Sequence, residues 1–264
     1  MNGVNKTLYI PLYSKSFVSQ KGLFLDDQKA EEIWDAEGFS LKRKSKSKWL
    51  SYYLGVRAAV FDEWLQQQLA ILPDAIVIHI GCGLDSRVMR LGDKNHKWYD
   101  VDVPEVIKER KRYYTEADHY EMIAGDARDC KWLSEIKETS SAIVIMEGVS
   151  MYLMVKDMQR LIDRLCNHFK EIKLLVDCYS TFAAKMSRYK NPINDVGVTE
   201  TYGIDSPEAY ENGNFTFVQE HTMIPQKYIN ELHGLEKLIF SKLYAGTFSR
   251  NLYRLLEYKK TSEG

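Results

Sequence analysis

Small and acidic residues follow four successive apolar runs in this 264-residue chain, each at the point where the run ends. Gly81-Cys82-Gly83 follows the first run, and Asp102, Asp126 and Glu147 follow the next three. Glycines let a ligand approach the backbone closely, and a carboxylate about twenty residues further on can accept hydrogen bonds from ribose hydroxyls. Acids also commonly cap the helices that follow strands, but the set together predicts a site for a nucleoside.

The glycine spacing separates two cofactors that both contain a ribose, NAD and S-adenosylmethionine. A dinucleotide-binding turn carries a third glycine where helix and strand pack closely, and Ser86 occupies that place here. The later acids favour a compact nucleoside, with the ribose on Asp102, the adenine amino group near Asp126 and Glu147 close to the reacting end. S-adenosylmethionine is therefore the favoured cofactor, and an NAD-dependent oxidoreductase is kept as an alternative.

The apolar runs that end in these residues have the length and β propensity of strands, and helical stretches separate them. The predicted strands are Ala75–Ile80, Lys97–Val101, Tyr120–Ala124, Ala142–Met146 and Ile172–Asp177, and the helices between them include Pro104–Tyr114 and Val155–Phe169. This alternation predicts right-handed β-α-β crossovers and a mainly parallel sheet with helices on both faces, an α/β fold. Ligands bind such a sheet at the carboxyl ends of its strands, where the glycines and acids lie.

The segments before the core are predicted to be helical. Helices at Asp26–Ala36 and Trp49–Leu72 make residues 1–73 a helical extension. Residues 74–178 then form the cofactor-binding core, and the whole chain, 1–264, is expected to be a single domain.

The segments after the core are predicted to cover and close the sheet. Residues 179–225, rich in Asn, Gly, Ser, Thr and Pro, are expected to form an inserted lid for the substrate. Residues 226–264 are expected to form a helix and an antiparallel hairpin. Its strands would be Glu236–Tyr244 and Asn251–Tyr258, which lie too close together for a crossover helix.

The composition argues against several classes of protein. Lys+Arg 36 against Asp+Glu 37 gives a formal net charge of −1, so there is no global attraction to nucleic acid or to an anionic membrane. The four cysteines occur singly, which indicates neither a disulfide framework nor a zinc site, and no metal is expected. No stretch approaches ~18 uninterrupted apolar residues and no cleavable leader is recognisable, so we expect a cytoplasmic protein.

A basic run, LKRKSKSKW, has five Lys or Arg residues between Lys42 and Lys48. Such a run could bind nucleic acid or an acidic carrier protein, but a solvated loop or helix start is more common, and we favour that interpretation. The aromatic residues around it either line a hydrophobic acceptor pocket or pack in a helical core. They are Trp34, Phe39, Trp49, Tyr52 and Tyr53.

Three motifs combine these features: GCGLDSR from Gly81 to Arg87, WYDVDVPEVIKER from Trp98 to Arg110 and EGVSMYL from Glu147 to Leu153. With them the chain resembles the leucine carboxyl methyltransferase family from about Tyr13 to Tyr210, most closely its bacterial tetracenomycin polyketide-synthesis type of O-methyltransferase. The resemblance implies a class I methyltransferase fold, with a Rossmann-like seven-stranded sheet. It also implies an S-adenosylmethionine-dependent O-methyltransferase.

The resemblance further implies roles for individual residues. The implied cofactor-binding residues are Lys15 and Arg57 at the methionine carboxylate, Gly81, Cys82 and Gly83 beside it, Asp102 at the ribose with Val103 next to it, Asp126 and Ala127 at the adenine, and Glu147 at the amino group. Tyr152 would face the substrate pocket and, with Arg57, position the acceptor and the methyl group. The expected partner is a small-molecule acceptor, without nucleic acid or membrane, and the oligomeric state is left open.

The chemistry of methyl transfer favours a carboxylate acceptor. In-line displacement from a cationic sulfonium depends on alignment and desolvation, and a carboxylate is already ionised at neutral pH. A phenol, with a pKa near ~10, would require a base. The candidate bases His79, His119 and His221 have no recognisable orienting acid beside them in the sequence. The small-molecule reaction, on a carboxylate or a hydroxyl of a polyketide-like acceptor, is therefore the prediction.

A protein C-terminal carboxyl methyltransferase is the alternative that the resemblance leaves open. The protein-modifying members of the family usually have leucine after the adenine-side aspartate, whereas Ala127 follows Asp126 here. An adenine contact through a backbone amide survives this difference. The closer overall resemblance to the polyketide-synthesis type is what favours a small acceptor over a protein C-terminus.

Overall fold

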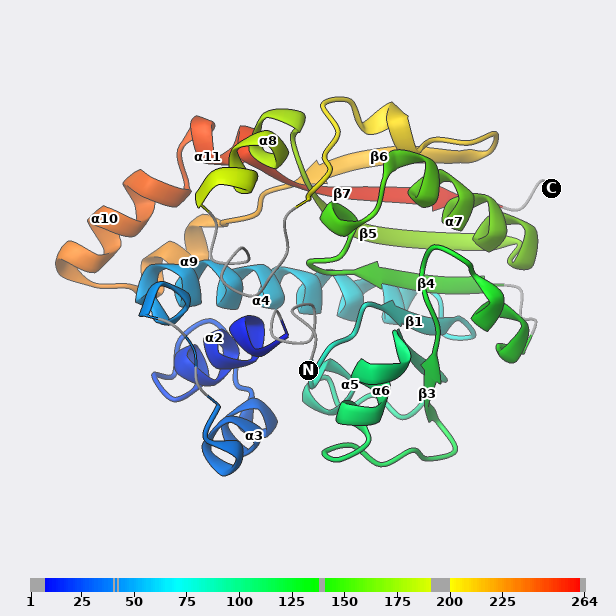
Figure 1. Ribbon diagram of the computed structural model, residues 1–264, viewed down its shortest axis with the longest axis horizontal. Helices are drawn as coiled ribbons and strands as arrows, with labels where there is room; N and C mark the ends of the chain where they lie inside the picture. The colour runs from blue at the N-terminus through cyan, green and yellow to red at the C-terminus, as the bar shows by residue number, and fades with distance from the viewer. Residues whose placement is uncertain (1–7, 40, 42, 138–140, 191–199, 262–264) are drawn as a thin grey trace.

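One sheet forms the centre of the molecule. The computed structural model describes residues 8–39, 41, 43–137, 141–190 and 200–261. Within them the strands are β1 (Ile76–Ile80), β2 (Trp98–Asp102), β3 (Tyr120–Ala124), β4 (Ser141–Met146), β5 (Glu171–Tyr179), β6 (Phe215–His221) and β7 (Tyr253–Lys260), in the order β3-β2-β1-β4-β5-β7-β6 (Figure 1). Strands β1 to β5 pair in parallel, and β7 is antiparallel to β5 and to β6. The predicted mainly parallel, seven-stranded sheet is confirmed.

Helices precede, connect and follow the strands. The α-helices are α2 (Tyr9–Ser19), α3 (Gln28–Glu37), α4 (Lys48–Ile71), α5 (Arg87–Arg90), α6 (Pro104–Arg110), α7 (Val155–His168), α8 (Thr181–Lys190), α9 (Gln226–Glu231), α10 (Gly234–Tyr244) and α11 (Thr247–Leu252), and the 3₁₀ helices are η1 (Arg43–Lys46), η2 (Lys131–Glu135), η3 (Ser150–Tyr152) and η5 (Pro207–Tyr210). The helices predicted before the sheet are confirmed as α3 and α4. Those predicted between strands are confirmed as α6, which is shorter than expected, and α7. No helix of the described residues is long and apolar enough to cross a membrane.

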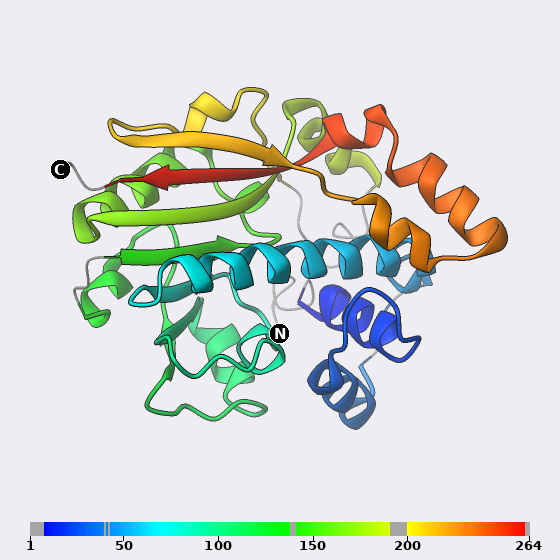
Figure 2. The same cartoon turned by 180° about the vertical axis from the view of Figure 1, so that it is seen from behind.

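The side chains of β1 alternate between two hydrophobic clusters, one on each face of the sheet. Val77 belongs to a cluster shared with residues of α2, α3 and α4, whereas Ile76, Ile78 and Ile80 belong to a cluster shared with α7. Figure 2 shows α4 lying across one face, and Figure 1 shows α7 on the opposite face. Because both faces are covered, every residue of β1 is buried, which is why the strand reads as an apolar run interrupted only by His79.

The 24-residue helix α4 fixes the position of Arg57 at the sheet. Val56, Phe61 and Leu65 of this helix are completely buried, and burying each such side chain contributes roughly 1.5–3 kcal/mol. Arg57 follows Val56 and is 5% exposed, so the apolar packing of the helix places a guanidinium inside the molecule. A buried cation needs partners, and these define the site described below.

The predicted C-terminal hairpin is wrong. Glu236–Tyr244 is not a strand but most of helix α10, and β7 pairs in antiparallel with β5 and with β6 instead. The apolar residues of α10 recur at helical spacing, at Leu235, Leu238, Ile239 and Leu243, and do not alternate. The strand was predicted from the β propensity of residues in Glu236–Tyr244, and their helical spacing was overlooked.

Strand β6 lies inside the segment predicted as a lid, residues 179–225. At the edge of the sheet most of its residues are partly or fully exposed, so its sequence lacks the continuous apolar run of a central strand. The described parts of the segment also contain α8 and η5. A lid formed by the rest of the segment remains a prediction.

Candidate active site

Two adjoining cavities lie at the carboxyl ends of the central strands. The first, of about 420 Å³, is lined by residues that follow β1, β2 and β4 and by residues of α2, α4 and β7. The second, of about 300 Å³, is lined by residues that follow β1, β2 and β3. Gly81, Asp102, Val149 and Tyr152 line both cavities. They meet beside β1, where the strand order reverses, and open α/β sheets bind ligands at that point.

The turn after β1 presents backbone to both cavities. Gly81 has a φ of +72°, and a Cβ there would lie 2.1 Å from Cγ2 of Val149, so a side chain would meet both strain and a clash. Gly83 also has a positive φ, +53°. Cys82 between them is buried, and burial raises the pKa of its thiol well above the ordinary value. Cys82 is therefore a neutral thiol and contributes its backbone to the turn.

Asp102, at the end of β2, is the carboxylate shared by the two cavities. Its oxygens accept hydrogen bonds from the backbone N–H of Gly83 and of Val103, each at 2.8 Å. Burial raises the pKa of Asp102 above its ordinary value, and the two backbone hydrogen bonds oppose part of that rise. Each carboxylate oxygen keeps a further lone pair. Asp102 can therefore accept from the two hydroxyls of a vicinal diol such as that of ribose.

Arg57 is the centre of a buried hydrogen-bond network beside the first cavity. Its Nε donates to Glu147 at 3.0 Å, and its Nη1 donates to Asp177 at 3.1 Å and to the hydroxyl of Tyr253 at 2.8 Å. Tyr253 in turn donates to Asp177, which also accepts from the N–H of Gly148 at 2.7 Å. Groups from β5, from β7 and from the residues after β4 thus fix the orientation of the guanidinium.

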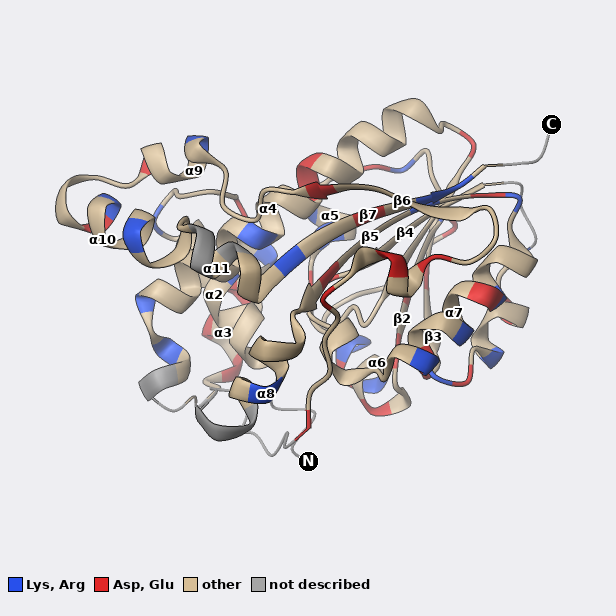
Figure 3. Cartoon of the chain, turned by 90° about the horizontal axis from the view of Figure 1, so that it is seen from above, with Lys and Arg blue, Asp and Glu red and all other residues tan. Residues whose placement is uncertain are grey.

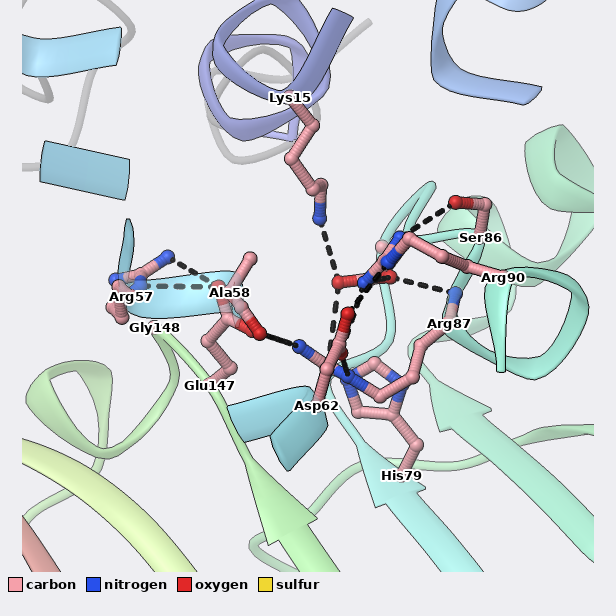
Figure 4. Close-up of polar contacts among 12 residues, drawn as sticks. Lys15, Arg57, Ala58, Asp62, His79, Ser86, Arg87, Arg90, Glu147 and Gly148 are labelled. Atoms are coloured by element: carbon pink, nitrogen blue, oxygen red, sulfur yellow. Dashed lines mark hydrogen bonds and ion pairs between the residues drawn. The ribbon is translucent and has the colours of Figure 1, made fainter. Parts of the chain in front are cut away.

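Glu147 joins Arg57 to a second buried arginine, Arg87. Nη2 of Arg87 lies 2.6 Å from Oε2 of Glu147, and Nε of Arg87 lies 2.5 Å from Asp62 of α4 (Figure 4). Burial alone would raise the pKa of Glu147, but attraction to Arg57, Arg87 and then Lys15 outweighs it and lowers the pKa to about 2. Glu147 is therefore ionised at neutral pH and links α4 to the helix after β1.

Lys15 of α2 reaches the first cavity from the helical extension. Its Nζ lies 2.6 Å from Oδ2 of Asp85 (Figure 4), and both side chains are buried. Burial alone would raise the pKa of Asp85, but Arg87, Lys15 and Arg90 lower it well below its ordinary value. Asp85 occupies one of the three N–H donors of Lys15, so the ammonium can also bind a ligand carboxylate.

The second cavity holds the residues predicted to meet adenine. Asp126, Ala127 and Val103 line it. Asp126 forms an ion pair with Arg128 at 2.5 Å, and its hydrogen bonds with Arg128 lower the pKa of Asp126 although burial opposes this. Asp126 is therefore an ionised hydrogen-bond acceptor at the edge of this cavity.

Tyrosines line the rest of the first cavity together with aliphatic side chains. Its tyrosines are Tyr53, Tyr152, Tyr179, Tyr244 and Tyr253. The ring of Tyr53 lies 5.5 Å from that of Tyr244 and 6.0 Å from that of Tyr253, measured between centroids. Burial raises the pKa of Tyr152, so its hydroxyl stays protonated. Of the aromatic residues near the basic run, Tyr53 lines the cavity, whereas Trp34, Phe39, Trp49 and Tyr52 pack with the core.

Every residue predicted for the site lines one of the two cavities or both. The sequence analysis missed Asp85, Arg87 and Tyr253, which hold the predicted cations and acids in place, and also Asp177. A signal existed for Asp177, because it ends the fifth predicted strand as the other acids end theirs. In the described parts of the chain, no group of three or more His, Cys, Asp or Glu is placed to hold a metal ion.

Comparisons with known proteins identify relatives of this chain. Residues 5–166 match the family model described as leucine carboxyl methyltransferase. The chain is 29% identical over 262 residues to the tetracenomycin polyketide synthesis O-methyltransferase TcmP of Streptomyces glaucescens, covering 98% of this chain and 97% of that protein. It is 26% identical over 234 residues to the S-adenosyl-L-methionine-dependent methyltransferase dpfgK of Gibberella zeae, covering 80% and 78% of the two chains.

Solved structures show the same fold. The crystal structure of magnesium protoporphyrin IX methyltransferase from Synechocystis PCC 6803 with bound SAH matches with a TM-score of 0.53 at 13% identity, over 89% of this chain and 93% of that one. At this identity the similarity concerns the fold, and it confirms the predicted Rossmann-like methyltransferase architecture.

Proposed function

The chain belongs to the leucine carboxyl methyltransferase family, and from this premise we propose that it methylates a carboxylate of a small-molecule acceptor. The protein is an S-adenosylmethionine-dependent methyltransferase, so the methyl donor is S-adenosylmethionine. The acceptor and the roles of single residues belong to the proposal. It is argued below from the two cavities, from their charge and from the groups around the acceptor.

The position of Asp102 between the two cavities is the observation that carries the proposal. The cofactor consists of an adenine, a ribose and a methionine part in that order, and the site offers one place for each. The second cavity, with Asp126 and Ala127, would take the adenine, and Asp102 with Val103 beside it would take the ribose diol. Gly81 to Gly83 leave room for the chain between ribose and sulfur, because side chains are absent at both glycines.

The methionine part fits the polar side of the first cavity. Lys15 and Arg57 line this cavity and would bind the carboxylate, and Glu147 would bind the ammonium group. Of the described lining residues, Lys15 and Arg57 are basic and Asp85, Asp102 and Glu147 are acidic, so acidic residues outnumber Lys and Arg by one. S-adenosylmethionine carries one net positive charge, so donor and cavity are complementary.

Charge disfavours NAD in the same site. Its pyrophosphate would bring two negative charges to the glycine turn. The cations near this turn are already paired, Lys15 with Asp85 and Arg110 with Asp100, and the carboxylate of Asp102 accepts from Gly83. An NAD-dependent oxidoreductase would also need a hydride-transfer pair such as Tyr-x-x-x-Lys, and Tyr152 and Lys156 have this spacing. Lys156 is exposed, however, and lines neither cavity.

The groups around the acceptor space favour a carboxylate over a phenol. Buried Tyr152 is held in its neutral form, and His79, the histidine of the described lining, has its Nδ1 3.6 Å from the buried carboxylate of Asp100. Neither provides an exposed base, and a carboxylate needs none because it is already ionised. Tyr152 lines both cavities, so we assign it to positioning the acceptor, with Arg57 positioning the cofactor carboxylate and, through it, the methyl group.

Two experiments test the proposal. Calorimetric titrations with S-adenosylhomocysteine and with NAD should give micromolar binding of the first (Kd ~1 μM, about −8 kcal/mol) and none of the second.

Incubation with isotopically labelled S-adenosylmethionine and a panel of aromatic carboxylic acids, matched phenols and peptides then identifies the acceptor. Mild base releases methanol from methyl esters but not from methyl ethers. Base-labile label on small acids supports the proposal, and label only in ethers or only on peptides contradicts it.

A further inference from the structure

The exposed face of α10 is apolar. Leu235, Leu238, Ile239 and Leu243 are 75%, 51%, 38% and 58% exposed. Leu238 and Ile239 follow Leu235 by three and four residues, and Leu243 follows Ile239 by four, so the residues form one stripe along the helix. Phe240 is the one residue of α10 that is buried. A surface helix usually turns such a stripe toward the core, so this one is oriented toward something outside the molecule.

The stripe has no part in the proposed methyl transfer. None of its four residues lines either cavity, although the last residue of the helix, Tyr244, lines the first cavity. Figure 3 shows α10 at one end of the molecule, well away from the sheet. Contiguous exposed apolar residues mark surfaces that bind a partner.

We propose that this face of α10 docks against the same face of a second copy of the chain. The two helices would lie antiparallel about a two-fold axis near Ile239, the symmetry most common in soluble dimers. In this register Ile239 meets Ile239 of the second copy, and Leu235 meets Leu243 of the second copy. The stripe is therefore complementary to itself.

The charged residues of α10 favour a second copy of the chain over a lipid surface as the partner. Lys242 lies within the exposed apolar face, where hydrocarbon would offer its ammonium no partner. In the antiparallel register Lys242 faces Glu236 of the second copy, because the two residues lie three positions on either side of Ile239. The pair forms twice in a symmetric dimer.

Glu236 is available for this contact. Its side chain is 40% exposed, and its oxygens already accept from Lys48 at 2.7 Å and from the hydroxyl of Tyr52 at 2.8 Å. Each carboxylate oxygen has two lone pairs, so a further donor can be accepted. Lys48 is the last lysine of the basic run at Lys42–Lys48. That ion pair therefore places the end of the run beside the docking face, with a role in orienting Glu236.

The size of the stripe sets the strength of the dimer. Together the four exposed fractions equal about two fully exposed aliphatic side chains per copy, whereas a standard interface buries about 800 Å² per partner. The association is therefore expected to be weak and concentration-dependent, with a Kd on the order of 10 μM.

A charge-exchange experiment on the full chain tests the register as well as the dimer. Sedimentation velocity from about 1 to 200 μM brackets the expected Kd. Lys242→Glu and Glu236→Lys each bring like charges together twice and should weaken dimerisation at least tenfold. An equimolar mixture of the two variants forms two opposite-charge pairs and should recover the dimer. Leu235→Glu should abolish association.

The controls are matched substitutions on other exposed helix positions. Lys108→Glu on α6 and Ile71→Glu at the end of α4 should leave the Kd unchanged. The proposal is overturned if the wild-type chain is a monomer throughout, if the mixture stays monomeric, or if the monomer binds phosphatidylserine vesicles through the stripe. The measurement uses no cofactor and no acceptor, so its result is independent of the proposed methyl transfer.

Discussion

The carboxylate of Asp102 lies 2.8 Å from the backbone nitrogen of Gly83, nineteen residues earlier in the chain. The acid after β2 and the glycine after β1 are therefore one structural unit, and the same carboxylate that would bind a ribose also holds the turn that borders both cavities. Substitutions at either position should affect ligand binding through this contact.

Asp102→Asn should weaken the binding of S-adenosylhomocysteine. The amide keeps the size of the side chain and one acceptor oxygen but loses the charge and the second acceptor, and a hydrogen bond to a charged group contributes about 1.5–3 kcal/mol. We expect a ten- to hundredfold rise in Kd by calorimetry. Asp126→Asn, in the second cavity but 30% exposed, should cause a smaller rise. An unchanged Kd in Asp102→Asn would remove Asp102 from the site.

The same affinity should depend on pH in one direction. Burial raises the pKa of Asp102 above 3.8, and only the ionised carboxylate can accept from both ribose hydroxyls. Affinity for S-adenosylhomocysteine should therefore be constant around neutral pH and fall as the pH drops toward this raised pKa. In Asp102→Asn the decline attributable to this group should be absent. A wild-type affinity that rises on acidification would contradict the assignment.

Gly81→Ala should destabilise the fold by about 3 kcal/mol or more, since it combines a left-handed backbone with a Cβ that lies 2.1 Å from Val149. Gly213→Ala is the matched control. Gly213 also has a positive φ, +54°, but nothing lies within 4 Å of its Cβ position. Backbone strain alone should therefore destabilise Gly213→Ala, by about 1 kcal/mol. Adding Val149→Ala to Gly81→Ala should remove the part of the destabilisation that exceeds that of Gly213→Ala, as measured by urea unfolding. Equal destabilisation by the two alanines would show that the clash is relieved by other movements.

The central sheet could be predicted because strands buried on both faces have a local signal. β1 and β4 read as continuous apolar runs between turns, and the parallel order then requires that the residues after them meet at one edge. Edge strand β6 has no such run, and α10 has the strand-like composition of a buried segment although its leucines face outward. Whether these residues are exposed depends on the tertiary structure, which short sequence patterns do not reveal.

The residues of the site that follow predicted strands could also be predicted from the sequence. Gly81, Asp102 and Glu147 follow strands, so topology alone brings them together. The partners of the charged residues were not predictable, because ion pairs such as Arg87 with Asp62 join residues 25 positions apart on different helices. Their spacing has no periodicity that a sequence could reveal.

Glu147→Gln should destabilise the protein by about 3 kcal/mol, because it removes the carboxylate that Arg57 and Arg87 share, while Asp177 and Asp62 still pair with them. The ordinary pKa of Glu147 is 4.5 and the folded value is about 2, so its contribution is fully present above pH 4.5 and is lost as the pH falls toward 2. The difference in unfolding free energy between wild type and variant should be constant above about pH 4.5 and narrow below it. Glu121→Gln, at an exposed ion pair on β3, should change stability by less than about 1 kcal/mol.

Tyr253→Phe should slow methyl transfer more than it weakens the fold. The hydroxyl of Tyr253 accepts from Arg57 at 2.8 Å and donates to Asp177, so its loss frees one side of the guanidinium while the ring still lines the first cavity. If Arg57 positions the cofactor carboxylate, a misplaced guanidinium should lower kcat about tenfold and leave the acceptor KM within about twofold.

Tyr258→Phe provides the matched control for this substitution. Tyr258 lies on the same strand, and its hydroxyl donates to the carbonyl of Pro207 at 2.8 Å, but it lines neither cavity. Tyr258→Phe loses one hydrogen bond and Tyr253→Phe loses two, so we expect losses of about 1 and about 2 kcal/mol of stability, and only Tyr253→Phe should lose turnover. Equal kcat values in the two variants would mean that Tyr253 supports the fold without positioning Arg57.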